Sequence, residues 1–181
     1  MKNNKTPGID YITKEILKEG GEEILQNLKT LFNKCLDAEK VASDWKEAIT
    51  VLLYKNGDKQ GLNNYRSITL LSQTYKILSI ILARSLTNKI EMFLTHEQAG
   101  FRRNYSTIDH LLIVKVLIEK ANEYHLPEYV ALMDYEKAFD STEIWATREI
   151  LWNSRVNCRY VDLIDYIYEE TQTSFQLQQQ T

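Results

Sequence analysis

The chain has 181 residues and a net charge of −3, and 44% of its residues are apolar and 26% are charged. Its length suits one domain or a piece of a larger one, and so few prolines and glycines exclude a disordered or low-complexity chain. No uncharged apolar run approaches 18 residues, so we expect no membrane span. Cys35 and Cys158 lack metal-ligand spacing, which predicts reduced thiols and an intracellular protein, with nucleus and cytoplasm left open.

Charge is distributed unevenly along the chain. Eight basic residues and three acids lie between Lys55 and Ser106, whereas ten acids and four bases lie between Leu126 and Thr173. The basic segment could bind phosphates, and the acidic segment could bind cations. Two solvated faces of opposite charge are the simpler alternative, and composition alone favours that alternative.

Helical patterns dominate the beginning of the chain. Between Ile24 and Leu36, apolar residues recur at three- and four-residue spacing, which is typical of a helix with one face in the core. Gly20-Gly21 separates this helix from a short one that begins near Thr13. We expect the apolar positions of the longer helix to form part of the core.

A strand pattern follows. The β-branched run Ala48–Tyr54 predicts a strand, and Asn56-Gly57 after it is a two-residue turn signal. A second strand is expected around Ser67–Leu71. The amphipathic segment Gln73–Leu94 then predicts a long helix.

The second half alternates helices with short apolar runs. Thr107–Tyr124 predicts a helix with an N-cap at Ser106 or Thr107. The run Tyr129–Met133 predicts a buried strand that presents Asp134 at its tip. Two more helices and the beginning of a strand are expected at about 142–152, 159–171 and 174–180. These elements together predict a helix-rich α/β architecture of the α+β type.

Three acids follow the predicted strand in the segment Asp134-Tyr135-Glu136-Lys137-Ala138-Phe139-Asp140. Carboxylates at the end of a buried strand are costly unless they are solvated or neutralised, and Mg²⁺ is a suitable neutralising ion because it prefers hard oxygen ligands. A solvated acidic turn after a strand is the better explanation of the segment when it is considered alone.

Several blocks accompany the acidic segment in a fixed order. They are Pro7-Gly8-Ile9-Asp10, Trp45, Leu53-Tyr54-Lys55-Asn56-Gly57-Asp58, Tyr65-Arg66-Ser67-Ile68-Thr69-Leu70-Leu71-Ser72, Tyr75-Lys76, Glu97-Gln98-Ala99-Gly100-Phe101-Arg102 and Ser106-Thr107. With the acidic segment, this order resembles the reverse transcriptase of non-LTR (LINE-type) retrotransposons. The blocks cover nearly the whole chain, so the resemblance is more specific than any single motif.

The resemblance implies a partial right-hand polymerase fold. Residues 1–125 would form the fingers and connecting helices, and residues 126–181 would begin the palm, without the second catalytic palm strands and the thumb. The implied activity is RNA-directed DNA synthesis on an RNA template, from a DNA primer and deoxynucleoside triphosphates, with Mg²⁺ as cofactor. No membrane partner is expected, and oligomeric state has no signal.

The resemblance also implies roles for individual residues in nucleotide binding. Lys55 and Arg66 match basic residues that reach the incoming nucleotide, where a point charge and a planar fork suit a triphosphate. Phe139 matches a bulky ring under the sugar, a steric gate against a 2′-hydroxyl. Without the neighbouring blocks, the first two would be exposed surface cations and the third a core aromatic.

Metal and nucleic-acid contacts are implied in the same way. Asp134 matches the first metal-binding carboxylate of the palm, and the backbone carbonyl of Tyr135 would add a ligand for a pair of Mg²⁺ ions about 4 Å apart. Arg102 is a candidate phosphate contact together with Arg103. Taken alone, Arg102-Arg103 is only a basic pair.

The sequence departs from the family pattern in three places. Ser67 replaces a common proline, and Asn104 replaces a frequent glycine but tolerates the left-handed conformation. No adjacent Asp-Asp pair occurs anywhere in the chain, so one metal carboxylate stands where three are expected. The chain also begins at the fingers, without a preceding endonuclease, and we predict no polymerase activity for it in isolation.

Two other readings of the function remain open at this point. The chain could be a non-catalytic retroelement remnant or a co-opted nucleic-acid or protein binding module. An unrelated helical interaction domain would require the ordered blocks to be coincidental. A Ser106, Asp109 and His110 triad lacks a nucleophile turn, and His96 and His125 are expected on the surface.

Overall fold

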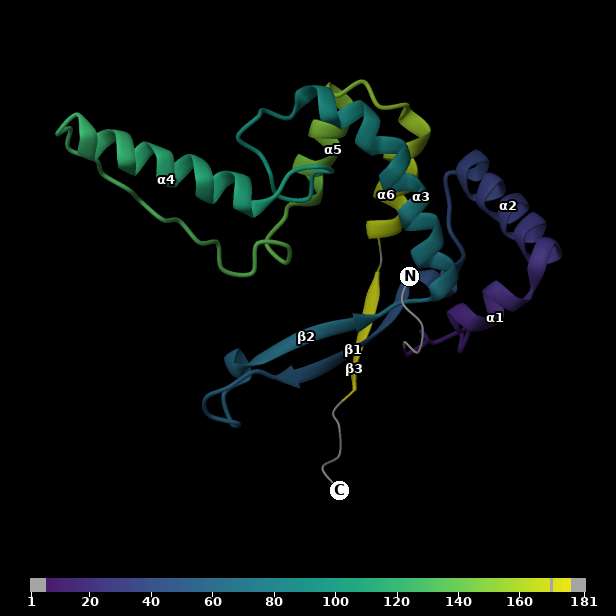
Figure 1. Cartoon of the computed structure of the whole chain (residues 1–181). Helices are drawn as coiled ribbons and strands as arrows, with labels where there is room; N and C mark the ends of the chain where they lie inside the picture. The colour runs from purple at the N-terminus through teal and green to yellow at the C-terminus, as the bar shows by residue number, and fades with distance from the viewer. Residues whose placement is uncertain (1–5, 170, 177–181) are drawn as a thin grey trace. The chain divides into compact units, whose positions relative to one another are not determined.

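A computed structural model describes residues 6–169 and 171–176 (Figure 1). The chain divides into two compact units, formed by residues 1–89 with 144–181 and by residues 90–143. The helices are α1 (Lys14–Glu19), α2 (Gly21–Ala38), α3 (Gln73–Ile90), α4 (Thr107–Glu123), α5 (Ile144–Asn153) and α6 (Cys158–Tyr168), with short 3₁₀ turns at Ser43–Trp45, Leu62–Asn64 and Glu91–Phe93. No helix in the described part of the chain is long and apolar enough to cross a membrane.

The sheet of the first unit has three strands in the order β2–β1–β3. β1 (Glu47–Tyr54) pairs antiparallel with β2 (Tyr65–Leu70) and parallel with β3 (Gln172–Gln176) (Figure 1). The parallel pairing joins segments that are more than a hundred residues apart in the sequence. The central position of β1 explains why its residues are the most buried of the sheet, since both of its edges are covered.

A row of threonine hydroxyls crosses the three strands. The buried Thr50 hydroxyl lies 3.1 Å from the hydroxyl of Thr69 on β2 and 2.7 Å from that of Thr173 on β3. A buried hydroxyl without a partner would be costly, so this row satisfies the polar side chain at the centre of the sheet.

The core of the first unit lies between α2, α3 and α6. Phe32 and Cys35 from α2 pack with Leu78 and Leu82 from α3 and with Leu163 from α6. Trp45 joins the cluster, with its ring 6.4 Å from that of Phe32 and 6.0 Å from that of Tyr75. Burial raises the pKa of the Cys35 thiol, because removing water disfavours the thiolate.

The N-terminal segment packs against the junction between β2 and α3. The Ser72 hydroxyl donates to Asp10 at 2.6 Å and accepts a 3.3 Å hydrogen bond from the backbone N–H of Tyr75 in the first turn of α3. Gly8 is buried, and a Cβ atom there would lie 2.5 Å from the backbone nitrogen of Ser72. Glycine at this position therefore permits the two backbones to approach each other.

The elements predicted for the first unit are confirmed, with two refinements. The α2 apolar stripe is only partly in the core, since Leu25 is exposed. The hairpin loop is longer than a two-residue turn, because the ladder closes with Lys55 donating to the carbonyl of Asn64. The expected C-terminal strand forms as β3, and its predicted residues beyond 176 lie outside the described range.

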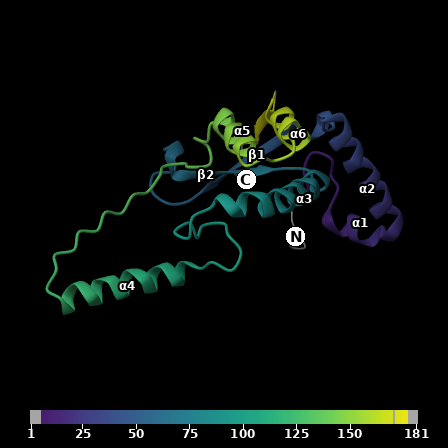
Figure 2. The ribbon, with the colours of Figure 1, turned by 90° about the horizontal axis from the view of Figure 1, so that it is seen from above.

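The second unit consists of α4 and the loops on either side of it (Figure 2). α4 begins at a capping box, in which Ser106 accepts from the N–H of Ile108 and Asp109 accepts from the N–H of Ser106. The predicted helix and its cap are confirmed. These contacts use the Ser106 and Asp109 side chains, two members of the triad considered from the sequence, for helix capping.

The prediction of a buried strand at Tyr129–Met133 was wrong. The segment forms no strand in the structure, and its side chains face solvent, with Leu132 95% exposed and Met133 85% exposed. A strand obtains its backbone hydrogen bonds from a neighbouring strand, and the three described strands all belong to the sheet of the first unit. Apolar content alone therefore does not make this run a strand.

Candidate nucleotide and nucleic-acid site

Two of the predicted nucleotide-binding residues share one face of the β1–β2 hairpin. Arg66 pairs with Leu53 in the strand register, and Lys55 continues β1 by one further pair, with its N–H 2.8 Å from the carbonyl of Asn64. Because alternate residues of a strand point to the same face, Lys55 and Arg66 are diagonal neighbours. Such neighbours have Cβ atoms about 7–8 Å apart.

Both basic side chains are exposed, and neither forms an ion pair with the part of the chain that the structure describes. The loop beyond them is held by its own hydrogen bonds, including those from the Tyr54 hydroxyl to the carbonyl of Gly57 and from the Tyr65 hydroxyl to the carbonyl of Lys59. The hairpin therefore presents two unneutralised cations on an ordered scaffold, an arrangement suited to binding an anion with several oxygens.

The acidic segment forms an exposed loop in the second unit. Asp134 and Tyr135 lie before its turn, in a stretch without regular secondary structure, and both are exposed. The following turn is closed by hydrogen bonds from the N–H groups of Asp140 and Ser141 to the carbonyl of Lys137, which has a left-handed backbone with φ of 50°. The structure thus brings Asp134 and Asp140 into one loop on the surface.

The described residues do not assemble a metal centre. They contain no group of three or more His, Cys, Asp or Glu side chains that could hold a metal ion. Mg²⁺ is bound through one or two carboxylates, several waters and substrate phosphates. Asp134 could supply one such carboxylate, but the chain's own donor set does not fit a complete two-metal site.

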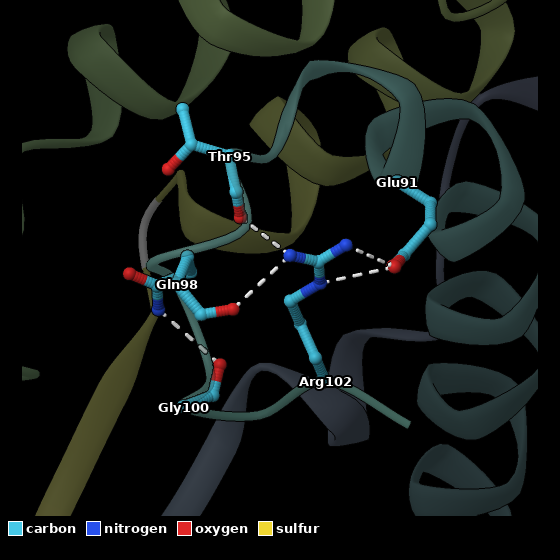
Figure 3. A network of polar contacts seen from close by, with 5 residues as sticks. All are labelled: Glu91, Thr95, Gln98, Gly100 and Arg102. Carbon is cyan, nitrogen blue, oxygen red and sulfur yellow. Dashed lines mark hydrogen bonds and ion pairs between the residues drawn. The ribbon is translucent and has the colours of Figure 1, made fainter. Parts of the chain in front are cut away.

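Arg102 is engaged within its own loop (Figure 3). Its guanidinium contacts one Glu91 carboxylate oxygen at 3.0 and 2.6 Å, and it donates to the backbone carbonyls of Thr95 and Gln98 at 2.5 and 3.1 Å. It also lies 4.1 Å from the ring centroid of Tyr105. With only 7% of its side chain exposed, this arginine uses its donors to fold the segment from residue 91 to residue 105.

Arg103 contrasts with its neighbour. Its side chain is exposed and forms no ion pair with the described residues. Arg103 can therefore reach a phosphate without breaking an internal contact, whereas Arg102 would have to exchange its contacts with Glu91. Asn104 follows the two arginines and precedes α4. It adopts the left-handed conformation, with φ of 64°, which the sequence indicated it could tolerate.

Phe139 lies beside a second aromatic residue. Its ring is 5.5 Å from that of Phe101, centroid to centroid, and the planes make an angle of 83°. This edge-to-face contact joins the acidic loop to the loop that Arg102 folds. The alternative that Phe139 is a core aromatic is excluded, since 78% of the residue is exposed.

The sequence also identifies the protein's relatives. The profile of the family described as reverse transcriptase (RNA-dependent DNA polymerase) matches residues 55–180. The chain belongs to the reverse transcriptase family. The unrelated helical interaction domain considered from the sequence is thereby excluded.

Individual relatives come from mobile elements. The RNA-directed DNA polymerase from mobile element jockey of Drosophila melanogaster is 30% identical over 144 residues, which is 78% of this chain and 16% of the relative. The Transposon TX1 uncharacterized 149 kDa protein of Xenopus laevis is 24% identical over 143 residues, 79% of this chain and 11% of the relative. The chain therefore spans less than a fifth of the length of these relatives.

Membership in the reverse transcriptase family implies a divalent metal cation, and the acidic loop contains Asp134, the carboxylate predicted to bind it.

The sequence pointed to Asp134, Phe139 and Arg102, but it gave no indication of Glu91 or of the role of Phe101. Glu91 lies eleven positions before Arg102, and no helical or strand period predicts a contact between them. Phe101 belongs to the Gly100-Phe101-Arg102 block that carries the family resemblance, so the sequence could have identified it as a candidate site residue.

Proposed function

We propose that this chain is the nucleotide- and template-binding part of a non-LTR retrotransposon reverse transcriptase, formed by the fingers and the beginning of the palm. Within such an enzyme it serves RNA-directed DNA synthesis from deoxynucleoside triphosphates on a primed RNA template, with Mg²⁺ as cofactor. The observation that carries this proposal is the family match over residues 55–180, which includes Lys55, Arg66, Arg102 and Asp134.

The hairpin supports a role in triphosphate binding. Lys55 and Arg66 lie on one face, are exposed and are not neutralised by the described chain. Ammonium and guanidinium groups make charge-assisted hydrogen bonds to phosphate oxygens. In the proposed function these two residues bind the phosphates. Phe139, in the other unit, is the residue that we assign to the sugar by family resemblance.

The acidic loop supports metal binding only in part. Asp134 supplies one carboxylate, and the backbone carbonyl of Tyr135 adds an oxygen next to it. Since the chain contains no Asp-Asp pair, we propose that the isolated chain binds nucleotide weakly and does not extend a primer. Losing a single preorganised charge-stabilising group lowers a rate by roughly 10²–10³.

Binding of dTTP to the purified chain in the presence of Mg²⁺ tests the hairpin assignment. Arg66→Ala and Lys55→Ala should each weaken binding about tenfold or more, as expected for the loss of a charge-assisted contact. Arg84→Ala, an exposed cation on α3, is the matched control and should leave the affinity unchanged. Equal losses in all three variants would mean that only net charge matters and would refute the site.

Primer extension on an RNA template tests the proposed inactivity. We expect no Mg²⁺-dependent incorporation by the chain, with or without Asp134→Ala. Incorporation that disappears in Asp134→Ala would contradict the argument that one palm carboxylate is insufficient.

A second candidate function is a non-catalytic nucleic-acid binding module. The observation that favours it is Arg103, exposed beside the internally engaged Arg102. This alternative predicts RNA affinity that falls with salt and on Arg103→Ala, in a chain that shows no difference between dTTP and inorganic triphosphate.

A further inference from the structure

Phe101 has an unusual backbone for an aromatic residue. Its φ is 61°, in the left-handed region, and 93% of the residue is exposed. This conformation is rare and unfavourable for a bulky side chain, and its burial offers no compensation. Some other interaction of the loop must hold Phe101 in place.

The contacts of the next residue provide that restraint. Arg102 binds Glu91 through two nitrogens and also bonds the carbonyls of Thr95 and Gln98 (Figure 3). The Arg102 N–H donates to the carbonyl of Ala99 at 3.3 Å, which closes a turn around Phe101. We call this set of contacts the Arg102 clasp.

A further hydrogen bond fixes the other side of the turn. The side-chain amide of Gln98 donates to the carbonyl of Gly100 at 3.2 Å. The backbone is therefore restrained immediately before and after Phe101. Because Arg102 is largely buried, its contacts are shielded from water and are stronger than those of an exposed pair.

The restrained ring meets the ring of Phe139. The centroids are 5.5 Å apart in an edge-to-face arrangement, and both loops belong to the same unit of residues 90–143. Aromatic pairs prefer this arrangement because the positive edge of one ring meets the negative face of the other. Since Phe139 is otherwise mostly exposed, Phe101 is the aromatic neighbour that can limit its rotation.

We propose that Phe101, held by the Arg102 clasp, is a positioning residue that fixes the ring of Phe139 for discrimination between deoxyribose and ribose. This inference rests on the proposed function, because it needs a nucleotide sugar beside Phe139. Phe101 acts through Phe139, and Glu91 and Arg102 act through Phe101. The clasp thus couples a segment before α4 to the selectivity of the acidic loop after it.

The ring contact is tested first, without nucleotide. The chain labelled with 4-fluorophenylalanine contains five phenylalanines, and Phe139→Leu identifies the ¹⁹F resonance of Phe139. Phe101→Leu should shift and broaden this resonance, and Glu91→Ala and Arg102→Lys should produce the same shift. Phe101→Tyr, which keeps the ring, should restore the wild-type position.

A matched control separates the contact from a general loss of structure. Phe93 is an exposed phenylalanine of the same unit, and Phe93→Leu should leave the Phe139 resonance unchanged. Circular dichroism should report the same helix content in all variants. A Phe139 resonance that does not respond to Phe101→Leu would overturn the inference.

Sugar discrimination is tested next, by titrating dUTP and UTP, which differ only in the 2′-hydroxyl, in the presence of Mg²⁺ and following the Phe139 resonance. Phe101→Leu should lower the preference for dUTP by about tenfold, out of the roughly hundredfold by which an apolar pocket rejects an added hydroxyl. Phe101→Tyr should retain the preference. An unchanged preference in a variant whose resonance has shifted would overturn the positioning role.

Failure of the proposed function is a distinct outcome. If the wild-type chain binds neither nucleotide while the resonance shifts occur, then the proposed nucleotide site is wrong and the role of Phe101 in selectivity is wrong with it. If both nucleotides bind and the resonance never responds to Phe101→Leu, then the nucleotide site stands and this inference alone is refuted.

Discussion

α3 and α4 are helices of similar length and apolar content in different units of the molecule, but only α3 packs into a core. α3 has 18 residues and buries Leu78 and Leu82 in the cluster of the first unit. α4 has 17 residues and buries none, with Leu111 68% exposed and Leu117 55% exposed. Residues 90–143, all of them described, contain no buried apolar residue.

The difference between α3 and α4 shows that a helix can form from local contacts alone, without packing into a core. The backbone hydrogen bonds of α4 are made with residues within the helix or directly next to it, and its first turn is completed by the capping box of Ser106 and Asp109. Exposed pairs between Lys115 and Glu119 and between Lys120 and Glu123 add small contributions. Most helical stability in proteins comes from tertiary packing, and α4 buries no residue, so we expect α4 to open far more readily than α3.

The largest expected effect comes from deleting a core side chain. Leu163 is fully buried between α2 and α3, and Leu163→Ala should lower the free energy of unfolding by about 2–5 kcal/mol. Leu117→Ala is the same chemical change at an exposed site of α4 and should cost less than about 0.5 kcal/mol. Urea denaturation followed by far-UV circular dichroism measures both.

Alkylation of Cys35 provides a second readout of the same change. Burial lowers access to this thiol and raises its pKa, so at pH 8 it should react slowly in the wild-type chain. Leu163→Ala should accelerate its reaction as the core opens, and the exposed Cys158 serves as the internal reference. Equal acceleration by Leu117→Ala would contradict the division into a packed and an unpacked unit.

A smaller effect is expected from a glycine substitution in each unit. A Cβ at Gly8 would meet the backbone of Ser72, so Gly8→Ala should displace the N-terminal segment and cost about 1–3 kcal/mol. Gly100→Ala in the second unit meets only the side-chain amide of Gln98, at the ordinary contact distance of 3.5 Å. Thermal unfolding should separate the two variants, and similar melting temperatures would refute the close packing at Gly8.

The same division explains how much of the fold the sequence could predict. Helices were predictable in both units, because period, caps and breakers are local properties of the chain. The strands β1 and β2 were predictable because a hairpin pairs neighbours in sequence. The run Tyr129–Met133 has an equally apolar sequence, but its structure depends on a partner strand that no local pattern supplies.

The candidate site divides in a similar way. Lys55 and Arg66 come together through hairpin register, which the sequence largely determines. Glu91 binds Arg102, and Phe101 meets Phe139, only because loops fold back on themselves. These contacts depend on backbone conformations such as the positive φ of Phe101 and Lys137. A positive φ can be expected from the sequence at glycine or asparagine, but not at phenylalanine or lysine.

Removing the cap of α4 should have an effect of about 1 kcal/mol on this helix alone. In Ser106→Ala the N–H of Ile108 loses its side-chain acceptor, and the amides of α4 should exchange roughly fivefold faster with deuterium. Ser85→Ala is the control, because this α3 hydroxyl only donates to the carbonyl of Ile81 within an established helix. Faster exchange in α3 after Ser106→Ala would show that the units are coupled in stability.

The smallest effect tests the surface ion pairs that support α4. Lys120 lies 2.6 Å from Glu123, but both side chains are more than half exposed, so the pair contributes at most about 0.3–0.5 kcal/mol. Lys120→Gln should therefore accelerate amide exchange in the last turns of α4 by no more than about twofold. In 1 M salt the screening length falls to about 3 Å, and the wild-type and variant rates should converge. A larger or salt-independent effect would mean that another contact of Lys120, such as the Tyr124 ring whose centroid lies 5.8 Å from its ammonium group, supports this end of α4.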